Sequence, residues 1–137
     1  RLEKGYRAWG SDITPEDTPL EAGLGFAVAS GKDFVGRDAI ERLRAEGVRR
    51  RLRCLVLSDA RAMCLGNEPV FSDGEVVARV TSGGIGYALG TSIALAYLPV
   101  DLATTGTPLS IDVFGERVPA AVADDPLYDP KGERIRL

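Results

Sequence analysis

The sequence predicts an α+β fold in which a short N-terminal α/β part is followed by an antiparallel β-barrel. One helix-length apolar period occurs in the first 47 residues, whereas the remainder shows five or six short β-like runs separated by turn signals. Strands at this spacing, with no helical period between them, are typical of a small barrel or sandwich. We therefore expect residues 50–125 to form an antiparallel barrel with no helix longer than a turn or two.

The N-terminal part contains two candidate elements. The apolar run GLGFAVA at 23–29 is short, contains glycines and is flanked by polar turns, which predicts a strand or an extended core segment. A helix is predicted next, because Asp38 precedes AIERLRAEG and Glu41 completes a capping box with it. Gly47 is expected to end this helix.

The C-terminal part alternates between short apolar runs and turn residues. After CLVLSD (54–59), the predicted strands are EPVF (68–71), EVVARVTSG (75–83), TSIALAYLP (91–99), TPLSIDVFG (107–115) and ERVPAAVAD (116–124). The expected breaks between them are SDG (72–74), GGIG (83–86) and GE (115–116).

Composition excludes several classes of function. The chain has 137 residues, of which 45% are hydrophobic, so it can bury a core, and its net charge of −3 gives no electrostatic case for nucleic acid. It has no histidine, which excludes a Ser-His-Asp triad, a Cys-His pair and a His-ligated metal. No apolar run approaches the roughly 18 residues of a membrane span, so we expect a cytoplasmic location with no membrane partner.

Some conspicuous residues are better explained without a ligand. GGIGYALG at 83–90 lacks the G-x-G-x-x-G spacing of a nucleotide loop, and a strand is predicted where a helix should follow. Cys54 and Cys64 are expected to be buried thiols rather than a disulfide. The acidic residues near the end of the chain are expected to face solvent; they are Asp124, Asp125 and Asp129.

Two long segments resemble a known family. RLEKGYRAWGSDITPEDTPLEAGLGFAV, followed by KDFVGRDAI, resembles the aminomethyltransferase (glycine-cleavage T-protein) family pattern R-L-E-x-G-x-x-x-(Y/W)-G-x-D-I and then T-P-(L/V)-E-A-G-L-x-(F/W). VTSGGIGYALGTSIALAYLP resembles the family's second signature, in its C-terminal barrel. EKGYRAWGSDI and the ending LYDPKGERIRL look closer to the folate-binding portions of dimethylglycine and sarcosine dehydrogenases than to T-protein itself.

The resemblance implies that the chain is a C-terminal fragment, in keeping with its start in RLEKGYRAWGSDI without Met. Residues 1–47 would be the C-terminal tail of the folate-binding α/β domain, and 48–137 the aminomethyltransferase-type β-barrel domain. The missing N-terminal part of the protein would be its partner, and in the dehydrogenases of the family it would include an FAD domain. The family's catalytic aspartate would lie before Arg1, so we expect no catalytic residue here and an inactive isolated chain.

In the intact protein, the resemblance implies that tetrahydrofolate takes a one-carbon unit from a small amine donor to give 5,10-methylenetetrahydrofolate. Glu3 matches the family's pterin-binding glutamate, and a carboxylate can accept hydrogen bonds from both neighbouring pterin donors. Arg51 and Arg53, in RRRLR (49–53), are the candidates for the carboxylates of the folate tail. Trp9 would wall the pocket or pack in the core, and Asp12 would cap or turn the local backbone.

Alternatives remain open at this point. Without the family resemblance, RRRLR is typical of a solvated edge before a strand. A non-catalytic folate-fold interaction module is a second possibility; the position of that group's cysteine motif reads SGKDFVGR here, without cysteine. A folate-dependent demethylase acting on a sulfur or oxygen donor is a third.

Overall fold

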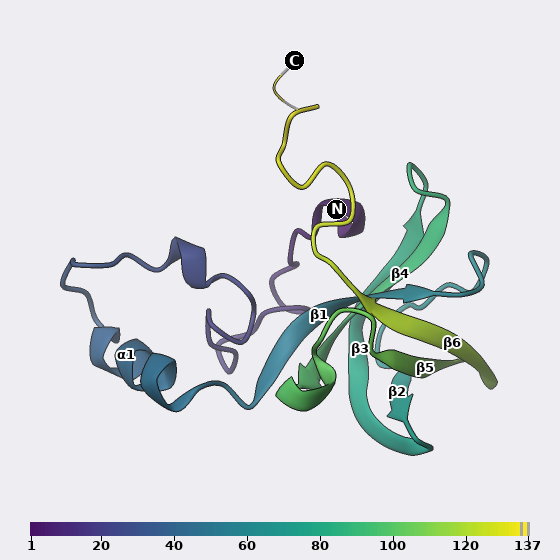
Figure 1. Ribbon diagram of the computed structural model, residues 1–137, viewed down its shortest axis with the longest axis horizontal. Helices are drawn as coiled ribbons and strands as arrows, with labels where there is room; N and C mark the ends of the chain where they lie inside the picture. The colour runs from purple at the N-terminus through teal and green to yellow at the C-terminus, as the bar shows by residue number, and fades with distance from the viewer. Residues whose placement is uncertain (135, 137) are drawn as a thin grey trace.

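The chain folds into a β-barrel with an irregular, helix-containing N-terminal part on one side (Figure 1). The computed structural model describes residues 1–134 and 136. The six strands are β1 (Arg50–Leu57), β2 (Pro69–Ser72), β3 (Glu75–Gly86), β4 (Thr91–Pro99), β5 (Pro108–Val113) and β6 (Glu116–Ala123). Outside the barrel lie the 3₁₀ turns η1 (Leu2–Lys4) and η2 (Gly25–Ala27) and the helix α1 (Arg37–Glu46), and the short turn η3 (Val100–Leu102) follows β4.

All strand pairs are antiparallel, and the barrel closes in the order β1-β4-β3-β2-β5-β6. Closure depends on β1, whose Cys54 pairs with Leu95 of β4 on one side and with Ala123 of β6 on the other. Each of the six strands in the described part of the chain therefore pairs with a neighbour on both sides. The predicted antiparallel barrel over 50–125 is confirmed.

The barrel interior forms the core. Its buried side chains alternate along the strands, as the period of two requires, and include Leu55, Val70, Val80, Ala94, Ala96, Leu98, Ile111 and Val122. In contrast, Ala22 is the single buried apolar residue before residue 48 in the described part of the chain. The N-terminal part therefore has no core of its own.

Three local predictions are wrong. Residues 23–29 are not a strand: Gly25–Ala27 form η2, and the side chain of Phe26 is 87% exposed. The helix begins at Arg37 with Gly36 as its N-cap, so Asp38 lies in the first turn and Glu41 pairs with Arg44 instead of completing a capping box. Gly47 does end the helix.

The third correction concerns GGIG at 83–86, which was expected to break the chain but lies within β3. Glycine is needed there for space. A Cβ on Gly83 would lie 2.5 Å from Cβ of Cys64, which is closer than two non-bonded carbon atoms can approach. The strand therefore turns only after Gly86, at the tip of the β3–β4 hairpin.

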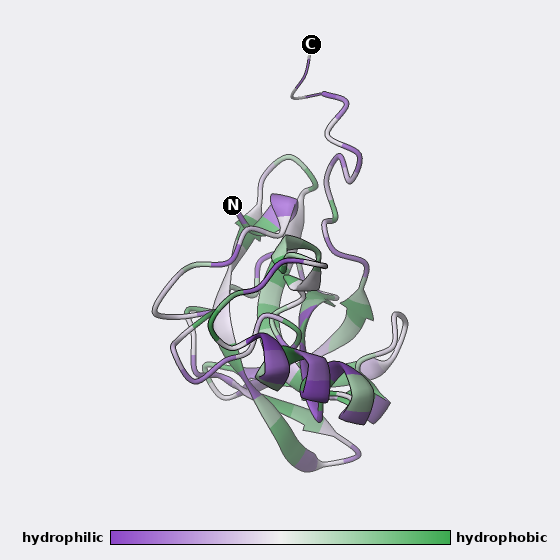
Figure 2. Cartoon of the chain, turned by 90° about the vertical axis from the view of Figure 1, so that its left-hand side faces the viewer, coloured by the Kyte–Doolittle hydropathy of each residue, from purple (hydrophilic) through white to green (hydrophobic). Residues whose placement is uncertain are grey.

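The helix α1 lies at the surface. None of its residues is buried, and Figure 2 shows it as a mostly hydrophilic element. In the described part of the chain no helix is long and apolar enough to cross a membrane.

Candidate functional site

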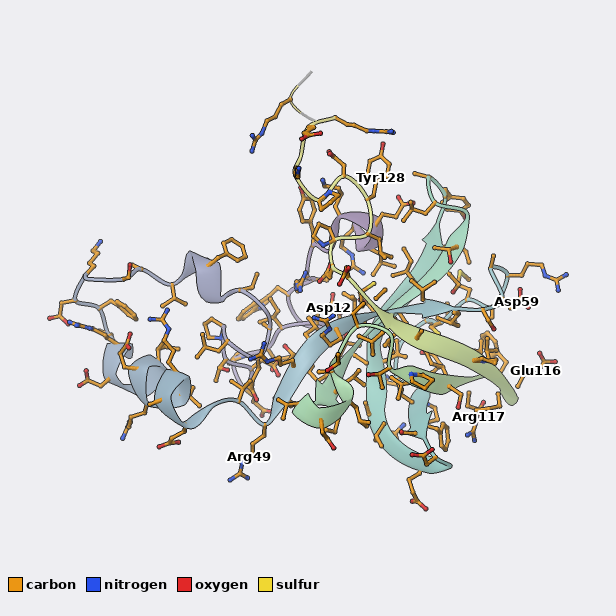
Figure 3. The ribbon with its side chains drawn as sticks, in the orientation of Figure 1. Asp12, Arg49, Asp59, Glu116, Arg117 and Tyr128 are labelled. Carbon is orange, nitrogen blue, oxygen red and sulfur yellow. The ribbon has the colours of Figure 1, made fainter. Side chains whose placement is uncertain are left out.

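The N-terminal segment 1–13 is fastened to the barrel through the buried carboxylate of Asp12, which lies at the junction of the two parts in Figure 3. Its Oδ1 accepts hydrogen bonds from the hydroxyls of Thr81 (2.5 Å) and Ser82 (2.6 Å) on β3. Its Oδ2 accepts the Ala8 N–H and pairs with Arg1, both at 2.8 Å. Asp12 is thus fully satisfied, and the prediction that it holds local backbone is confirmed.

Glu3 lies on η1, beneath the tip of the β3–β4 hairpin. Its Oε1 accepts the backbone N–H groups of Ala88 (2.8 Å) and Leu89 (3.1 Å). The hairpin approaches closely because Gly86 has no side chain; a Cβ there would lie 3.0 Å from Cγ and Oε1 of Glu3. The carboxylate is therefore held against the barrel by main-chain donors.

A second attachment joins the N-terminal segment to the residues after β6. Nη2 of Arg7 lies 2.6 Å from Oδ2 of Asp125, and the side chains are 13% and 10% exposed. The Arg7 guanidinium also donates to the carbonyls of Gly5 and Ala22. The Asp125 Oδ1 is buried without a hydrogen-bond partner among the described residues.

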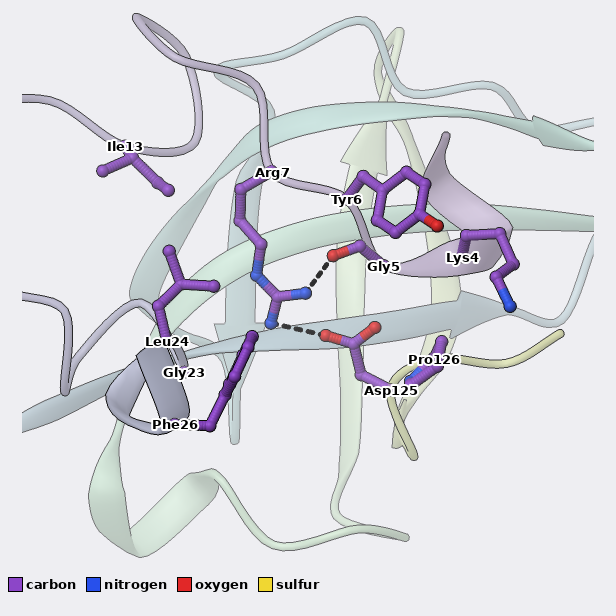
Figure 4. Close-up of a pocket in the computed structure, with 10 residues that line it drawn as sticks. All are labelled: Lys4, Gly5, Tyr6, Arg7, Ile13, Gly23, Leu24, Phe26, Asp125 and Pro126. Carbon is purple, nitrogen blue, oxygen red and sulfur yellow. Dashed lines mark hydrogen bonds and ion pairs between the residues drawn. The ribbon is translucent and has the colours of Figure 1, made fainter. Parts of the chain in front are cut away.

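This ion pair forms one wall of a cavity of about 530 Å³ (Figure 4). The other lining residues are Lys4, Gly5, Tyr6, Ile13, Gly23, Leu24, Phe26 and Pro126. Lys4 in turn pairs with Asp129, at 3.5 Å between Nζ and Oδ2. The expectation that the late acidic residues face solvent is therefore wrong for Asp125 and Asp129, and only Asp124 is exposed.

Trp9 is 74% exposed, so it does not pack in the core. Its backbone forms an isolated bridge with Ile13. Tyr6 (59% exposed) and Phe26 are exposed as well, and both line the cavity beside the Arg7–Asp125 pair.

The three arginines of RRRLR that lie on β1 have different surroundings. Arg50 is structural, because it pairs with Asp17 (2.9 Å) and Glu21 (3.0 Å) and its guanidinium stacks on Tyr97. Burial alone would raise the pKa of Glu21, but hydrogen bonds from Thr18 and the Arg50 guanidinium outweigh it and lower this pKa. The Arg50–Glu21 pair thus holds the segment around residue 20 on β1.

Arg51 and Arg53 project together from β1 into one cavity of about 390 Å³. Arg51 forms no ion pair with the described residues, whereas Arg53 donates to the Thr105 hydroxyl (2.9 Å) and the Ala123 carbonyl (3.1 Å). Arg53 Nε is buried without a partner in the described chain. A second cavity, of about 360 Å³, shares Arg51 and adds Arg44. The charged side chains that line these two cavities are all arginines, which is the chemistry that binds carboxylates.

The structure therefore brings Arg51 and Arg53 together but places Glu3 and Trp9 elsewhere, outside the lining of both arginine cavities. The pair of Arg7 and Asp125 was missed by sequence reasoning. Arg7 lies inside the RLEKGYRAWG segment that resembles the family pattern. Its partner Asp125 is far away in the sequence, so no local sequence pattern predicts the pair.

No group of His, Cys, Asp or Glu side chains suited to a metal ion occurs among residues 1–134 and 136. Cys54 and Cys64 are buried free thiols, as expected. Burial raises the pKa of each to about 12, so neither is a reactive thiolate at neutral pH.

Comparison with known proteins agrees with the fold. Residues 50–129 match the glycine cleavage T-protein C-terminal barrel domain family. The aminomethyltransferase T of the glycine cleavage system from Bartonella henselae superposes with a TM-score of 0.87 at 29% identity, over 95% of this chain and 37% of that one. The chain belongs to the aminomethyltransferase (glycine-cleavage T-protein) family, as its C-terminal barrel part.

The similar sequences belong to proteins that are all longer than this chain. Mitochondrial dimethylglycine dehydrogenase from Rattus norvegicus is 39% identical over the whole of this chain, which spans 16% of that protein. Aminomethyltransferase from Nostoc sp. is 43% identical over 93% of this chain, and the match spans 34% of that aminomethyltransferase. Human mitochondrial sarcosine dehydrogenase is 42% identical over 81% of this chain and 12% of its own length. The chain thus corresponds to a minor part of each relative.

Proposed function

We propose that this chain is the C-terminal part of a tetrahydrofolate-dependent aminomethyltransferase unit in a protein like dimethylglycine or sarcosine dehydrogenase. In that protein the unit would form 5,10-methylenetetrahydrofolate from a small amine donor. The observation that supports this most strongly is the 39% identity to dimethylglycine dehydrogenase over the entire chain, including the segment before the barrel. The shorter aminomethyltransferases match 93% of the chain.

We propose residues 1–47 as the tail of the folate-binding α/β domain and 48–137 as the barrel domain. The near-absence of buried apolar residues before residue 48 supports this division, because such a segment gains stability only by packing on something else. The exposed side chains of Tyr6, Trp9 and Phe26 offer the apolar surface for that packing.

Glu3 is the proposed pterin contact. A carboxylate oxygen has about two lone-pair sites, and Oε1 of Glu3 already accepts two backbone N–H groups. Oε2 accepts no hydrogen bond from the described residues and is the oxygen available to a pterin donor. A bidentate contact would replace one hairpin donor, and the Leu89 N–H, at 3.1 Å, makes the longer of the two bonds.

Arg51 and Arg53 are the proposed contacts for the carboxylates of the folate tail, since they share one cavity and its other lining residues carry no charge. Trp9 is the proposed aromatic wall of the pocket; its exposure leaves the indole face open to a ligand. Folate would supply the one-carbon chemistry, and these residues would bind and orient it. FAD would belong to a domain outside this chain.

Isothermal titration of tetrahydrofolate into the complete protein, with an assay for 5,10-methylenetetrahydrofolate and amine oxidation, tests the proposal. Saturable binding with product formation from an amine is the expected result. Binding without turnover would favour the non-catalytic module, and turnover only with a sulfur or oxygen donor would favour the demethylase. The cytoplasmic location expected from the sequence stays a prediction, because the dehydrogenases named above are mitochondrial.

A further inference from the structure

We propose that the tip of the β3–β4 hairpin positions the carboxylate of Glu3, and that Gly86 is the positioning residue that allows it to do so. The role of Glu3 in folate binding belongs to the function proposed above, and the positioning of its side chain is additional to that function. The proposal is based on two observations: the contacts at the hairpin tip and the close approach that Gly84 and Gly86 of β3 allow. These glycines do not form a nucleotide-binding loop.

The first step concerns orientation. Two consecutive backbone N–H groups, of Ala88 and Leu89, donate to a single oxygen of Glu3 at 2.8 and 3.1 Å. Main-chain donors at a hairpin tip are fixed in direction, so they define where Oε1 lies. The second oxygen, Oε2, accepts no hydrogen bond from the described part of the chain, so it is the oxygen left for a ligand.

The second step concerns space. Gly86 does not have a positive φ, so it is not required there for its backbone conformation. It is required for closeness, because a Cβ would lie 3.0 Å from Cγ and Oε1 of Glu3 and 2.8 Å from Cδ1 of Ile93. Gly84, two residues earlier, leaves similar room for Leu2, whose Cδ1 would lie 3.2 Å from a Cβ at that position. Residues two apart lie on the same face of a strand, so Gly84 and Gly86 together leave the space on β3 against which η1 packs.

The consequence concerns binding. A glutamate side chain at the surface samples several rotamers, and a ligand that needs one of them must order it. Here the hairpin tip orders the carboxylate before any ligand arrives. We therefore expect any side chain at position 86 to move Glu3 and to weaken binding to its free oxygen, even though residue 86 does not touch the ligand.

Amide hydrogen exchange on the 137-residue chain tests the contact without any ligand. In Glu3→Ala, exchange of the Ala88 and Leu89 amides should accelerate by about tenfold or more, since the charge-assisted acceptor is lost. The Gly115 amide, which donates to Asp112 at 2.8 Å in the β5–β6 hairpin, is the internal reference and should not change. Unchanged exchange at residues 88 and 89 would overturn the proposal.

Folate titrations of the complete protein test the consequence. Gly86→Ala should weaken binding by about tenfold. Gly86→Ala with Ile93→Val, which removes the Cδ1 atom that the new Cβ would meet, should show the same loss, because the contact with Glu3 remains. Gly115→Ala is the matched control: its Cβ would meet nothing within 4 Å, although its φ of 86° carries strain. It should leave folate affinity within about twofold of the parent.

A double-mutant cycle separates positioning from simple damage. If Gly86 acts through Glu3, adding Gly86→Ala to Glu3→Gln should cause little further loss of affinity. Losses that multiply, or a Gly86→Ala protein that binds as the parent does, would overturn the positioning role. Parent-like affinity of Glu3→Gln alone would overturn the pterin contact proposed above, and the exchange experiment would still decide whether the hairpin holds Glu3.

Discussion

Arg7 and Asp125 form an ion pair, 2.6 Å between Nη2 and Oδ2, that ties the first residues of the chain to the segment following the last strand. Both side chains are almost covered, at 13% and 10% exposure. Together with Lys4–Asp129 and the hydrogen bond from Tyr128 N–H to the Glu3 carbonyl, the pair places the C-terminal residues beside η1. The position of Glu3 therefore depends on residues at both ends of the sequence.

Removal of Arg7 should destabilise the fold because it leaves the nearly buried carboxylate of Asp125 without a counter-charge. Arg7→Ala removes the charged partner that Asp125 has among the described residues. We therefore expect a loss of about 3 kcal/mol in the free energy of unfolding, measured by urea denaturation. Arg44→Ala, which breaks the exposed pair with Glu41, is the control and should cost less than about 0.5 kcal/mol. Equal losses in the two variants would mean that the Arg7 pair is no stronger than a surface contact.

Gly5 has a role that differs from that of a flexible turn. Its φ is 65°, and a Cβ there would clash with Oδ1 of Asp125, whose carboxylate is held by its ion pair with Arg7. Gly10 has a φ of 94° with nothing within 4 Å of a Cβ. Both alanine substitutions introduce backbone strain of about 1 kcal/mol, but Gly5→Ala should cost roughly 2 kcal/mol more than Gly10→Ala, because a well-packed site resists overpacking. Thermal unfolding of the two variants measures the difference.

Much of the barrel was predictable because its signals are local. β4 spans Thr91–Pro99, the run predicted at 91–99, since Gly90 and Pro99 mark the ends of a continuous apolar segment. The turn at Asp73 and Gly74, with φ of 49° and 87°, was predicted from SDG for the same reason. A strand buried in a closed barrel needs little more than its apolar pattern and two turn residues to be recognised.

The errors arose where distant packing decides the structure. Residues 23–29 are apolar enough for a strand, but all six barrel strands already have two neighbours, so the run turns as η2 with Phe26 at the surface. The glycines at 83–86 gave a turn signal, although they serve close approach to Cys64 and Glu3. The Arg7–Asp125 pair, likewise, has no sequence signature, because it forms only when the two ends of the chain meet.

The two buried thiols should make the fold sensitive to alkali. An unfolded cysteine ionises near pH 8.5, whereas burial raises the pKa of Cys54 and Cys64 to about 12 in the folded chain. Below about pH 8.5 the thiols are protonated in both the folded and the unfolded chain, so they do not make the free energy of unfolding depend on pH. Above it, the unfolded state releases protons that the folded state keeps, so the free energy of unfolding should fall by up to about 1.4 kcal/mol per pH unit for each thiol.

Urea denaturation between pH 8 and pH 10 measures this slope, and the double variant Cys54→Ala, Cys64→Ala provides the comparison. The variant should be less stable at neutral pH, because both sulfur atoms fill the interior, but its stability should fall less steeply with pH. The pKa of Tyr97 is also raised to about 12 by burial, with Asp17 adding to the effect, and its contribution starts only near pH 10. Identical slopes for the parent and the double variant would show that the thiols ionise equally well in the folded state.

The 137-residue chain by itself should bind tetrahydrofolate weakly or not at all, because the proposed contacts at Glu3 and at Arg51 with Arg53 lie in separate places and the structure shows no enclosed pocket, among the described residues, that joins them. A ligand pocket normally surrounds most of its ligand. Isothermal titration of tetrahydrofolate into the chain at micromolar concentration should give no heat of binding. A dissociation constant in the micromolar range or tighter would contradict this expectation.

In the complete protein, Glu3→Gln should weaken folate binding far more than Arg51→Lys or Arg53→Lys does singly. The amide keeps one acceptor for the hairpin N–H groups but presents a donor to the pterin donors and removes the charge, at a cost of about 2–4 kcal/mol, or roughly 30-fold to 1000-fold in affinity. Lysine keeps the charge at the tail, where Arg51 is exposed and a second arginine lines the same cavity, so each of these variants should cost about 1 kcal/mol or less. Folate titrations of the three variants, with amine oxidation measured in parallel, give the ranking; if an arginine variant loses more than Glu3→Gln, the pterin contact lies elsewhere and the tail is the main source of affinity.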